Sequence, residues 1–179
     1  NAMPTESLEA YDAYLKGQQF LKTRLSEELE QAILAFERAV ELDPGFALAW
    51  VGLAHSQVWA TQLRDDLPET TRAIRQEAID RALDLDPLLG EAWTAQGEIY
   101  YNQGRVEDAR QAIQKGIELS PNYADGYFLY AQTMQDLQHI REKIAFVEKA
   151  LELDPRQPHY RSILGLEYVR MGDYAEGER

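Results

Sequence analysis

Apolar side chains recur every three or four residues along most of the chain, a spacing that places them on one face of a helix. No run of alternating β-branched residues, the pattern typical of a strand, interrupts the series. The pattern therefore predicts an all-α protein. The predicted helices cover residues 6–24, 27–42, 46–63, 68–85, 89–103, 105–119, 123–137, 139–153 and 157–171.

Four copies of one polar phrase separate these helices: ELDPGFALAW, DLDPLLGEAW, ELSPNYADGY and ELDPRQPHYR. In each copy a leucine closes an apolar stripe and a proline follows two residues later. Proline disfavours helical geometry in the residue before it and cannot extend a helix that has just ended. The Asp or Ser between them can accept hydrogen bonds from backbone N–H groups at the start of the next helix. Each phrase therefore predicts a helix end, a turn and a new helix.

The prolines of the phrase also define a period. Pro87, Pro121 and Pro155 are 34 residues apart, whereas Pro44 precedes Pro87 by 43 residues. A constant period in this range indicates stacked repeats, and about 34 residues is the length of a tetratricopeptide (TPR) repeat. The third repeat matches the family pattern at Trp93, Gly97, Tyr100, Gly104, Ala109, Ile113, Gly116 and Pro121. The sequence resembles TPR proteins over nearly its whole length.

The resemblance implies a right-handed superhelix, an α-solenoid of antiparallel helix pairs. The expected repeats are residues 7–44, 45–87, 88–121 and 122–155, with a partial repeat at 156–179. We expect residues 3–179 to form a single domain. Residues 1–2, which precede the first methionine, are interpreted as a scar left by an expression tag.

Small residues are expected where two helices approach closely, because the distance between helix axes depends on the side chains at the crossing. Gly97 and Ala131 occupy such positions on first helices of their repeats. Gly104 and Gly172 follow first helices, where a left-handed residue usually ends the helix.

Two regions depart from the repeat pattern. In the fourth repeat, Gln138 replaces the turn glycine and Lys143 replaces a small residue of the second helix, so close packing is in doubt there. The second repeat is nine residues longer than the 34-residue period. Within this extra length, Pro68 is predicted in the first turn of a helix and Asp66 is a candidate cap.

Charge and composition exclude some classes of partner. The net charge of −13, from 18 basic and 31 acidic residues, argues against nucleic acid and against an anionic membrane surface. The longest mainly apolar stretch, residues 46–60, is too short and too polar to enter and cross a bilayer. There is no cysteine, which fits a cytoplasmic protein and leaves a periplasmic one open.

The sequence offers no catalytic or metal-binding motif. His55, His139 and His159 each lack a second histidine at ligand spacing, and no glycine-spaced ligand loop surrounds Asp65 and Asp66. Phosphate-binding and nucleophile motifs are also absent from the sequence. We therefore expect no enzymatic activity, no catalytic residues, no metal and no cofactor.

Candidate binding residues follow from the family geometry, in which the first helix of each repeat lines the concave surface. Aromatic and apolar groups outside the core, interleaved with polar ones, are typical of a binding surface. The candidates on the first helices are Tyr14, Val51, His55, Trp59, Glu91, Thr94, Glu98, Tyr101, Asp125, Phe128, Gln132 and Asp136.

The acidic candidates predict the chemistry of the ligand. Glu91 and Glu98 are two helical turns apart on one predicted helix, and Asp125 and Asp136 are three turns apart on the next. The four carboxylates are expected to edge a shared acidic trough. We therefore expect a protein or peptide partner that combines basic and apolar side chains.

Some TPR domains hold the acidic C-termini of chaperones through a clamp of lysine, asparagine and arginine. The corresponding positions here are Val51, His55, Thr94 and Glu98, so this ligand is not expected.

The function that the resemblance implies is a non-enzymatic scaffold that binds a peptide or protein segment in its concave groove. Two alternatives remain open: a regulatory or sensor segment of a larger bacterial signalling protein, and a self-assembly module. In the second alternative, homo-oligomers form through the partial C-terminal repeat, where Ile163, Leu164 and Tyr168 are expected to be incompletely covered.

Overall fold

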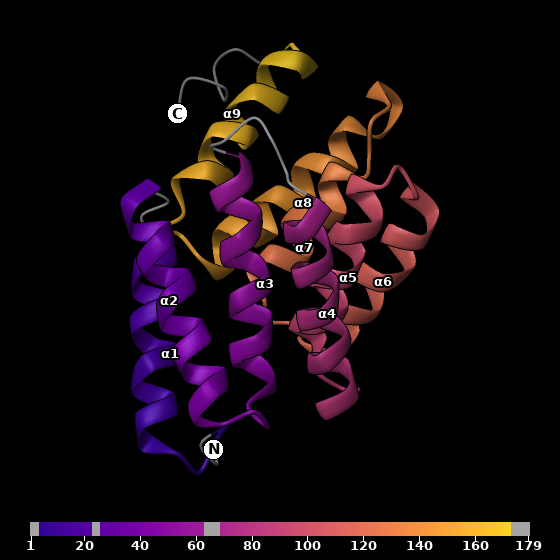
Figure 1. Cartoon of the computed structure of the whole chain (residues 1–179). Coiled ribbons are helices and arrows are strands. Elements are labelled where there is room, and N and C mark those ends of the chain that lie inside the picture. Colours follow the sequence, from indigo (N-terminus) through magenta and orange to yellow (C-terminus); the bar gives the residue numbers. More distant parts are fainter. Residues whose placement is uncertain (1–3, 23–25, 63–68, 173–179) are drawn as a thin grey trace. The chain divides into compact units, whose positions relative to one another are not determined.

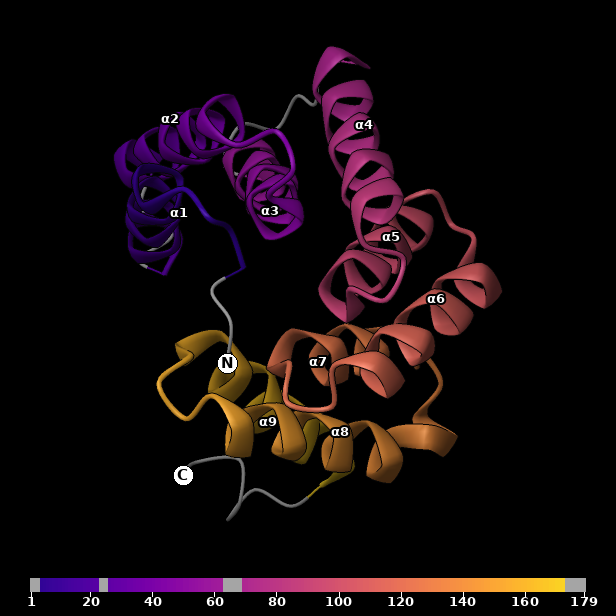
Figure 2. The ribbon, with the colours of Figure 1, turned by 90° about the horizontal axis from the view of Figure 1, so that it is seen from below.

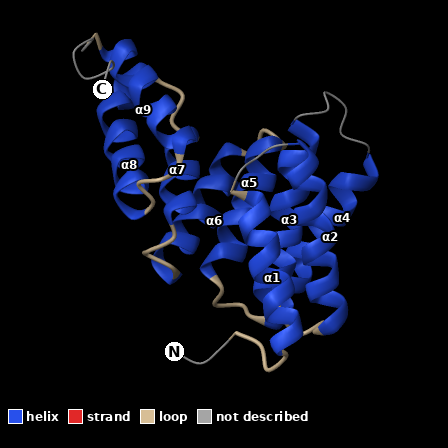
Figure 3. Cartoon of the chain, turned by 90° about the vertical axis from the view of Figure 1, so that its left-hand side faces the viewer, coloured by secondary structure: helices blue, strands red, loops and turns tan. Residues whose placement is uncertain are grey.

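The computed structural model describes residues 4–22, 26–62 and 69–172, and every regular element in them is a helix (Figures 1 and 3). The chain divides into two compact units, Asn1–Ala95 and Gln96–Arg179. The expected all-α, TPR-like fold of paired helices is confirmed. The elements are α1 (Leu8–Leu21), α2 (Ser26–Leu42), α3 (Ala47–Gln62), α4 (Glu69–Leu85), α5 (Gly90–Asn102), α6 (Val106–Leu119), α7 (Ala124–Gln132), a short 3₁₀ helix (Leu137–His139), α8 (Ile140–Leu153) and α9 (Pro158–Met171).

The predicted helices agree with the observed ones to within about three residues at each end, with one exception. The sequence predicts a helix over 123–137, but α7 ends at Gln132, so this prediction is wrong. Two predicted features, the Asp66 cap and Pro68, lie outside the described residues, and so do residues 1–2, which are interpreted from the sequence as a tag scar.

The early end of α7 has a physical cause in the neighbouring helix. The guanidinium of Arg110, on α6, donates to the carbonyl oxygen of Thr133 at 2.9 Å and to its hydroxyl at 3.2 Å. That hydroxyl in turn donates to the carbonyl of Tyr130 at 2.7 Å. A continuing helix would need the Thr133 carbonyl for an amide one turn later. The chain therefore leaves the helix and reaches α8 through the 3₁₀ turn.

The repeated phrase forms the turn that it predicts. After α2, the N–H of Phe46 donates to the Asp43 carbonyl at 3.1 Å, and the N–H of Gly45 donates to the Asp43 carboxylate at 2.9 Å. The turns at Asp86 and Asp154 repeat both bonds. The aspartate therefore satisfies the backbone where the helical pattern stops.

The last residue of each phrase stabilises the same turn through a hydrogen bond. Its side chain donates to the carbonyl of the proline six residues earlier, although three different residue types do so. The pairs are Trp50 with Pro44 (3.0 Å), Trp93 with Pro87 (2.8 Å), Tyr127 with Pro121 (3.0 Å), and Arg161 with Pro155. Each proline carbonyl is thus paired with a donor from the first turn of the following helix.

The glycines that end first helices behave as expected. Gly104 has φ of +76° and Gly172 has φ of +86°, in the left-handed region that favours glycine. The backbone of these two turns therefore depends on the residue type, whereas the turn after α7 does not use such a glycine.

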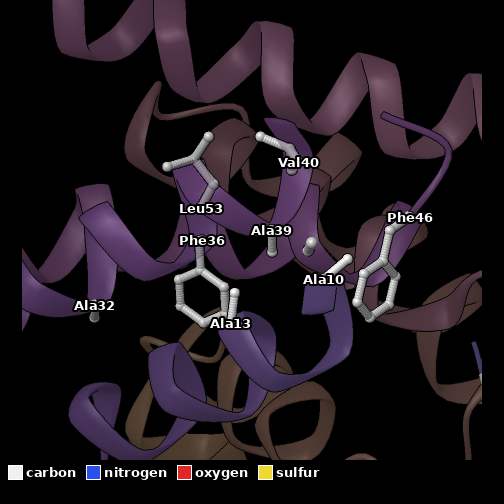
Figure 4. Packing of buried hydrophobic residues seen from close by; sticks show 9 residues of the cluster. Ala10, Ala13, Ala32, Phe36, Ala39, Val40, Phe46 and Leu53 are labelled. Carbon is white, nitrogen blue, oxygen red and sulfur yellow. The ribbon is translucent and has the colours of Figure 1, made fainter. Parts of the chain in front are cut away.

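The core of the first unit is built around one aromatic ring. Helices α1, α2 and α3 lie side by side (Figures 1 and 2), and Phe36 of α2 is fully buried among alanines (Figure 4). Its ring occupies the space that a Cβ atom would need at Gly17 of α1 and at Gly52 of α3, at 2.8 Å and 2.3 Å. The two flanking helices can approach the ring this closely because neither has a side chain at the contact.

The second unit uses the same device with a branched side chain. A Cβ atom on Gly97 of α5 would lie 2.4 Å from a side-chain carbon of Ile113 on α6. The close crossing predicted at Gly97 is therefore confirmed. Between α7, α8 and α9 the core consists of Phe128, Ala131, Val147, Ala150 and Tyr160, all buried.

We expect the substitution Gly52→Ala to destabilise the protein, because the new methyl group meets the Phe36 ring, which is also packed against Gly17. Overpacking costs about 1–3 kcal/mol and outweighs the roughly 1 kcal/mol by which alanine favours a helix. Urea titration measures the change. The same substitution made together with Phe36→Leu should cost less; an equal cost in both backgrounds would contradict the assigned contact.

We also expect Tyr127→Phe to lower the free energy of unfolding by about 0.5–1.5 kcal/mol, because it removes the hydrogen bond to Pro121. Tyr11→Phe is the matched control, since no hydrogen bond of the Tyr11 hydroxyl is found within the described ranges. Thermal or urea unfolding of both variants separates the outcomes. An equal loss of unfolding free energy in the two variants would show that the Tyr127–Pro121 hydrogen bond does not stabilise the protein.

Candidate functional site

The predicted binding residues lie on α1, α3, α5 and α7, the first helices of their repeats, with one exception. Asp136 follows the end of α7 and is exposed in the connection to α8. Trp59 belongs to α3, but its side chain lies outside the described part of the structure.

Three of the predicted binding residues are buried rather than displayed. Val51 and Phe128 are each 4% exposed, and Thr94 is completely covered. Their side chains form part of the core, which corrects the expectation that they present free surface. His55, Glu91 and the remaining helical candidates whose side chains are described are half-buried; whether they bind a partner stays a prediction.

Tyr14 is also largely part of the core of the first unit. Its ring centroid lies 5.0 Å from that of Phe46 and 5.9 Å from that of Phe36. Its hydroxyl accepts a hydrogen bond from the side-chain amide of Gln18 at 3.2 Å. Burial, together with the nearby Glu91 carboxylate, raises the pKa of Tyr14 to about 12. The Tyr14 hydroxyl therefore stays neutral across the physiological range.

The helical face that the sequence predicts for the two aspartates of the acidic trough is absent. Asp125 and Asp136 do not lie on one helical face, because α7 ends at Gln132. The Asp125 carboxylate accepts a hydrogen bond from the hydroxyl of Tyr160. Glu98 remains half-buried on α5. The prediction that Asp125 and Asp136 lie three turns apart on one face of α7 is therefore wrong.

A cavity of about 160 Å³ lies in the second unit. Its walls come from α5, α7 and α9, which are the first helices of three consecutive repeats, and from α8. It is lined by Tyr101, Phe128, Ala131, Gln132, Lys143, Val147, Ile163 and Glu167. Three of these, Tyr101, Phe128 and Gln132, are among the residues that the sequence predicts.

The cavity combines an apolar floor with polar groups. Phe128, Ala131 and Val147 are buried and belong to the core cluster of this unit. Tyr101 and Gln132 are half-buried, and the Tyr101 hydroxyl accepts a hydrogen bond from the amide of Gln135 at 3.4 Å. The arrangement can hold a small group with one apolar and one polar end.

An ion network forms one wall of the cavity. The Lys143 ammonium on α8 lies 2.8 Å from the carboxylate of Glu167 on α9, and these two side chains are only 13% and 3% exposed. The guanidinium of Arg170 reaches both oxygens of the same carboxylate, at 3.0 and 3.1 Å. Two cations thus share one buried carboxylate.

Sequence reasoning missed this network as part of a site. It noted Lys143 as a departure from the small residue of the repeat but did not connect it with Glu167. A signal was present, since Glu167 stands four residues after Ile163, on the face of α9 that carries apolar side chains. A carboxylate on an apolar face indicates a buried charge that needs a cation.

The apolar face of α9 is incompletely covered, as the sequence predicts. Ile163, Leu164 and Tyr168 are each partly exposed, and Leu166 is 53% exposed. The Tyr168 hydroxyl donates to the carboxylate of Glu148 on α8 at 2.7 Å. Self-assembly through this face stays a prediction.

Within the described ranges, no group of three or more His, Asp or Glu side chains is placed to hold a metal ion. In the same part of the chain, no helix is long and apolar enough to cross a membrane.

Two adjacent stretches of the chain, residues 90–123 and 124–157, match the tetratricopeptide repeat family. Among curated proteins, the human mitochondrial import receptor subunit TOM70 is 24% identical over 123 residues, which cover 67% of this chain and 19% of the relative. The mouse interferon-induced protein with tetratricopeptide repeats 3 is 33% identical over 79 residues, covering 42% and 20%. The chain thus spans about a fifth of the length of these relatives.

Solved structures share the fold. A thermophilic TPR protein of Thermus thermophilus superposes with a TM-score of 0.70 at 21% identity, covering 94% of this chain and 86% of that one. PilF of Pseudomonas aeruginosa gives 0.61 at 23% identity, covering 95% and 72%. The first TPR of Spaghetti, bound to the HSP90 peptide SRMEEVD, gives 0.55 at 18% identity, covering 76% and 99%.

The raised pKa of Tyr14 predicts a specific loss of stability in alkali. The unfolded chain releases this proton near the ordinary value of 10.0, whereas the folded chain holds it to about 12. Between these values the folded state binds more protons, so the free energy of unfolding falls as the pH rises. From pH 9 to about 11.5 the natural protein should lose about 1–2 kcal/mol more than Tyr14→Phe. If urea titrations showed the same pH dependence of the unfolding free energy for both proteins, the raised pKa of Tyr14 would be contradicted.

Proposed function

The chain belongs to the tetratricopeptide repeat family, and from this premise we propose that it is a non-enzymatic scaffold that binds a segment of a protein partner. The segment would lie along α7, α9 and the C-terminal half of α5, which belong to the second unit, over the cavity that they line. Family membership alone does not fix a function, so the proposal rests on the site.

One observation carries the proposal: first helices of three consecutive repeats supply walls of a single cavity of about 160 Å³. An extended segment that crosses these helices could place one side chain in it. Partly exposed aromatic and amide groups, such as Tyr101 and Gln132, stand at the same cavity and could contact the segment. A recess with both apolar and polar walls is suited to one anchoring side chain.

Two of the similar proteins are named for a role of this type. The Spaghetti segment holds an HSP90 peptide, and TOM70 is named an import receptor. We do not extend the chaperone peptide to this chain, because Val51, His55, Thr94 and Glu98 replace the clamp residues.

The net charge of −13 favours a partner segment of opposite charge. We propose that the segment is basic overall and carries apolar anchors. Opposite charge would mainly raise the association rate and would lose effect in salt, while the buried anchors would set the dissociation rate.

The proposal is tested by selecting peptides from a displayed random library on the whole chain and measuring their affinity by fluorescence anisotropy. We expect Gln132→Ala, at the cavity, to weaken the selected peptides by about tenfold, the loss of a well-placed polar contact. Gln114→Ala is the matched control, because Gln114 is exposed on the second helix α6 and bonds to Glu118.

Two outcomes would contradict the proposal. One is the failure of every selected peptide to bind the purified chain. The other is equal weakening by Gln132→Ala and Gln114→Ala, which would place the binding surface elsewhere.

A further inference from the structure

We infer that the cavity lined by α5, α7, α8 and α9 is a subsite for an acidic side chain of the bound segment, with glutamate as the fitting residue. The inference rests on the proposed function and names one position of the ligand. Its basis is the ammonium of Lys143, which lines the cavity and is only partly satisfied by the protein.

Lys143 is deeply placed for a charged group. Its side chain is 13% exposed, and its one ion pair within the described residues is with Glu167, at 2.8 Å. An ammonium has three N–H donors, and a buried cation needs nearly all of them paired. Lys143 therefore has donors to spare at the wall of a cavity.

The count of charges gives the sign of the missing partner. Lys143 and Arg170 both bind the Glu167 carboxylate, so the cluster holds two positive charges against one negative charge. Glu167 is 3% exposed, whereas Arg170 is 40% exposed and can reach solvent. The uncompensated positive charge is therefore felt most strongly on the buried side of the network, at Lys143.

The size and lining of the cavity suit a carboxylate on a short aliphatic stem. A volume of about 160 Å³ is close to that of engineered cavities that accept benzene, a ligand of about six heavy atoms. The stem of a glutamate would contact Val147, Ile163 and Phe128, and its carboxylate would face Lys143. A charge-assisted hydrogen bond of this kind is about twice as strong as a neutral one.

The competing classes of side chain fit less well. A purely apolar side chain would cover the Lys143 ammonium and leave it without water, which is costly for a charge. A lysine or arginine of the ligand would add a third cation to a carboxylate that two already share. The inference is compatible with a segment that is basic overall, because the negative net charge acts over the whole surface and the positive excess is local.

The test uses capped single residues as probes on the whole chain, with labelled methyl groups of Val147 and Ile163 observed by NMR. N-acetylglutamate N-methylamide should shift these methyl signals in a saturable way, at millimolar concentration as expected for so small a ligand. The glutamine analogue, which has the same shape and no charge, should bind at least about fivefold more weakly.

Two variants of the network should change the affinity in opposite directions. Lys143→Met keeps the stem and removes the ammonium, and should weaken the glutamate probe by about tenfold. Glu167→Gln removes the competing carboxylate and should strengthen the probe several-fold, a result that poor folding could not produce. Lys149→Met is the matched control, because Lys149 lies on the same helix and pairs with Glu152 outside the cavity.

The inference would be overturned by equal shifts with the glutamate and glutamine probes, by the absence of methyl shifts with glutamate, or by unchanged affinity in Lys143→Met. A free C-terminal carboxylate offers the same chemistry, so N-acetylleucine is a further probe. Tighter binding of N-acetylleucine than of the glutamate probe would overturn the assignment to a side chain.

Failure of this inference can be told apart from failure of the proposed function. Selected peptides that bind through Gln132 but carry no acidic residue at the cavity would support the proposed scaffold function and contradict the inferred acidic subsite. Saturable binding of the glutamate probe without any binding peptide would show that the cavity binds a carboxylate and would contradict the proposed scaffold function.

Discussion

The close approach of helices at positions without a side chain is the constraint on which the rest of this protein depends. In the first unit, the Phe36 ring fills the space left by Gly17 and Gly52 on two different helices. In the second unit, Ile113 lies against Gly97 in the same way. Because the distance between helix axes is fixed by the residues at the crossing, these contacts set how far apart the helices stand. The surface formed by those helices inherits its dimensions from them.

Much of the fold could be predicted from the sequence because its determinants are local. A helix end, a proline and an aspartate within a few residues decide the turn, and Gly104 and Gly172 supply the left-handed backbone. The end of α7 could not be predicted in this way. It depends on Arg110, which lies 23 residues before Thr133 in the chain and meets it only after α6 and α7 have packed.

The candidate site was predicted less well for a similar reason. The family geometry places the candidates on the first helices, but it does not tell which side chains on them remain uncovered. Val51, Thr94 and Phe128 are covered by contacts that form between helices. The pairing of Lys143 with Glu167 joins a second helix to the first helix of the next repeat, and no spacing within one helix encodes it. A buried charge pair of this kind costs desolvation energy, which the attraction between the two charges repays only where their geometry is good.

The hydrogen bonds that stabilise the turns affect how the number of repeats can change during evolution. Each proline carbonyl is bonded by a side chain six residues later, so the donor and the acceptor belong to one short segment. Each bond joins the proline that ends one repeat to the first helix of the next, so every complete repeat between two such turns carries a donor near its start and an acceptor at its end. Tryptophan, tyrosine and arginine all serve as the donor, so the copies can drift apart in sequence while the linkage survives. Insertion or loss of a whole repeat therefore brings a donor and an acceptor together again at the new junction, without a matching change elsewhere in the chain.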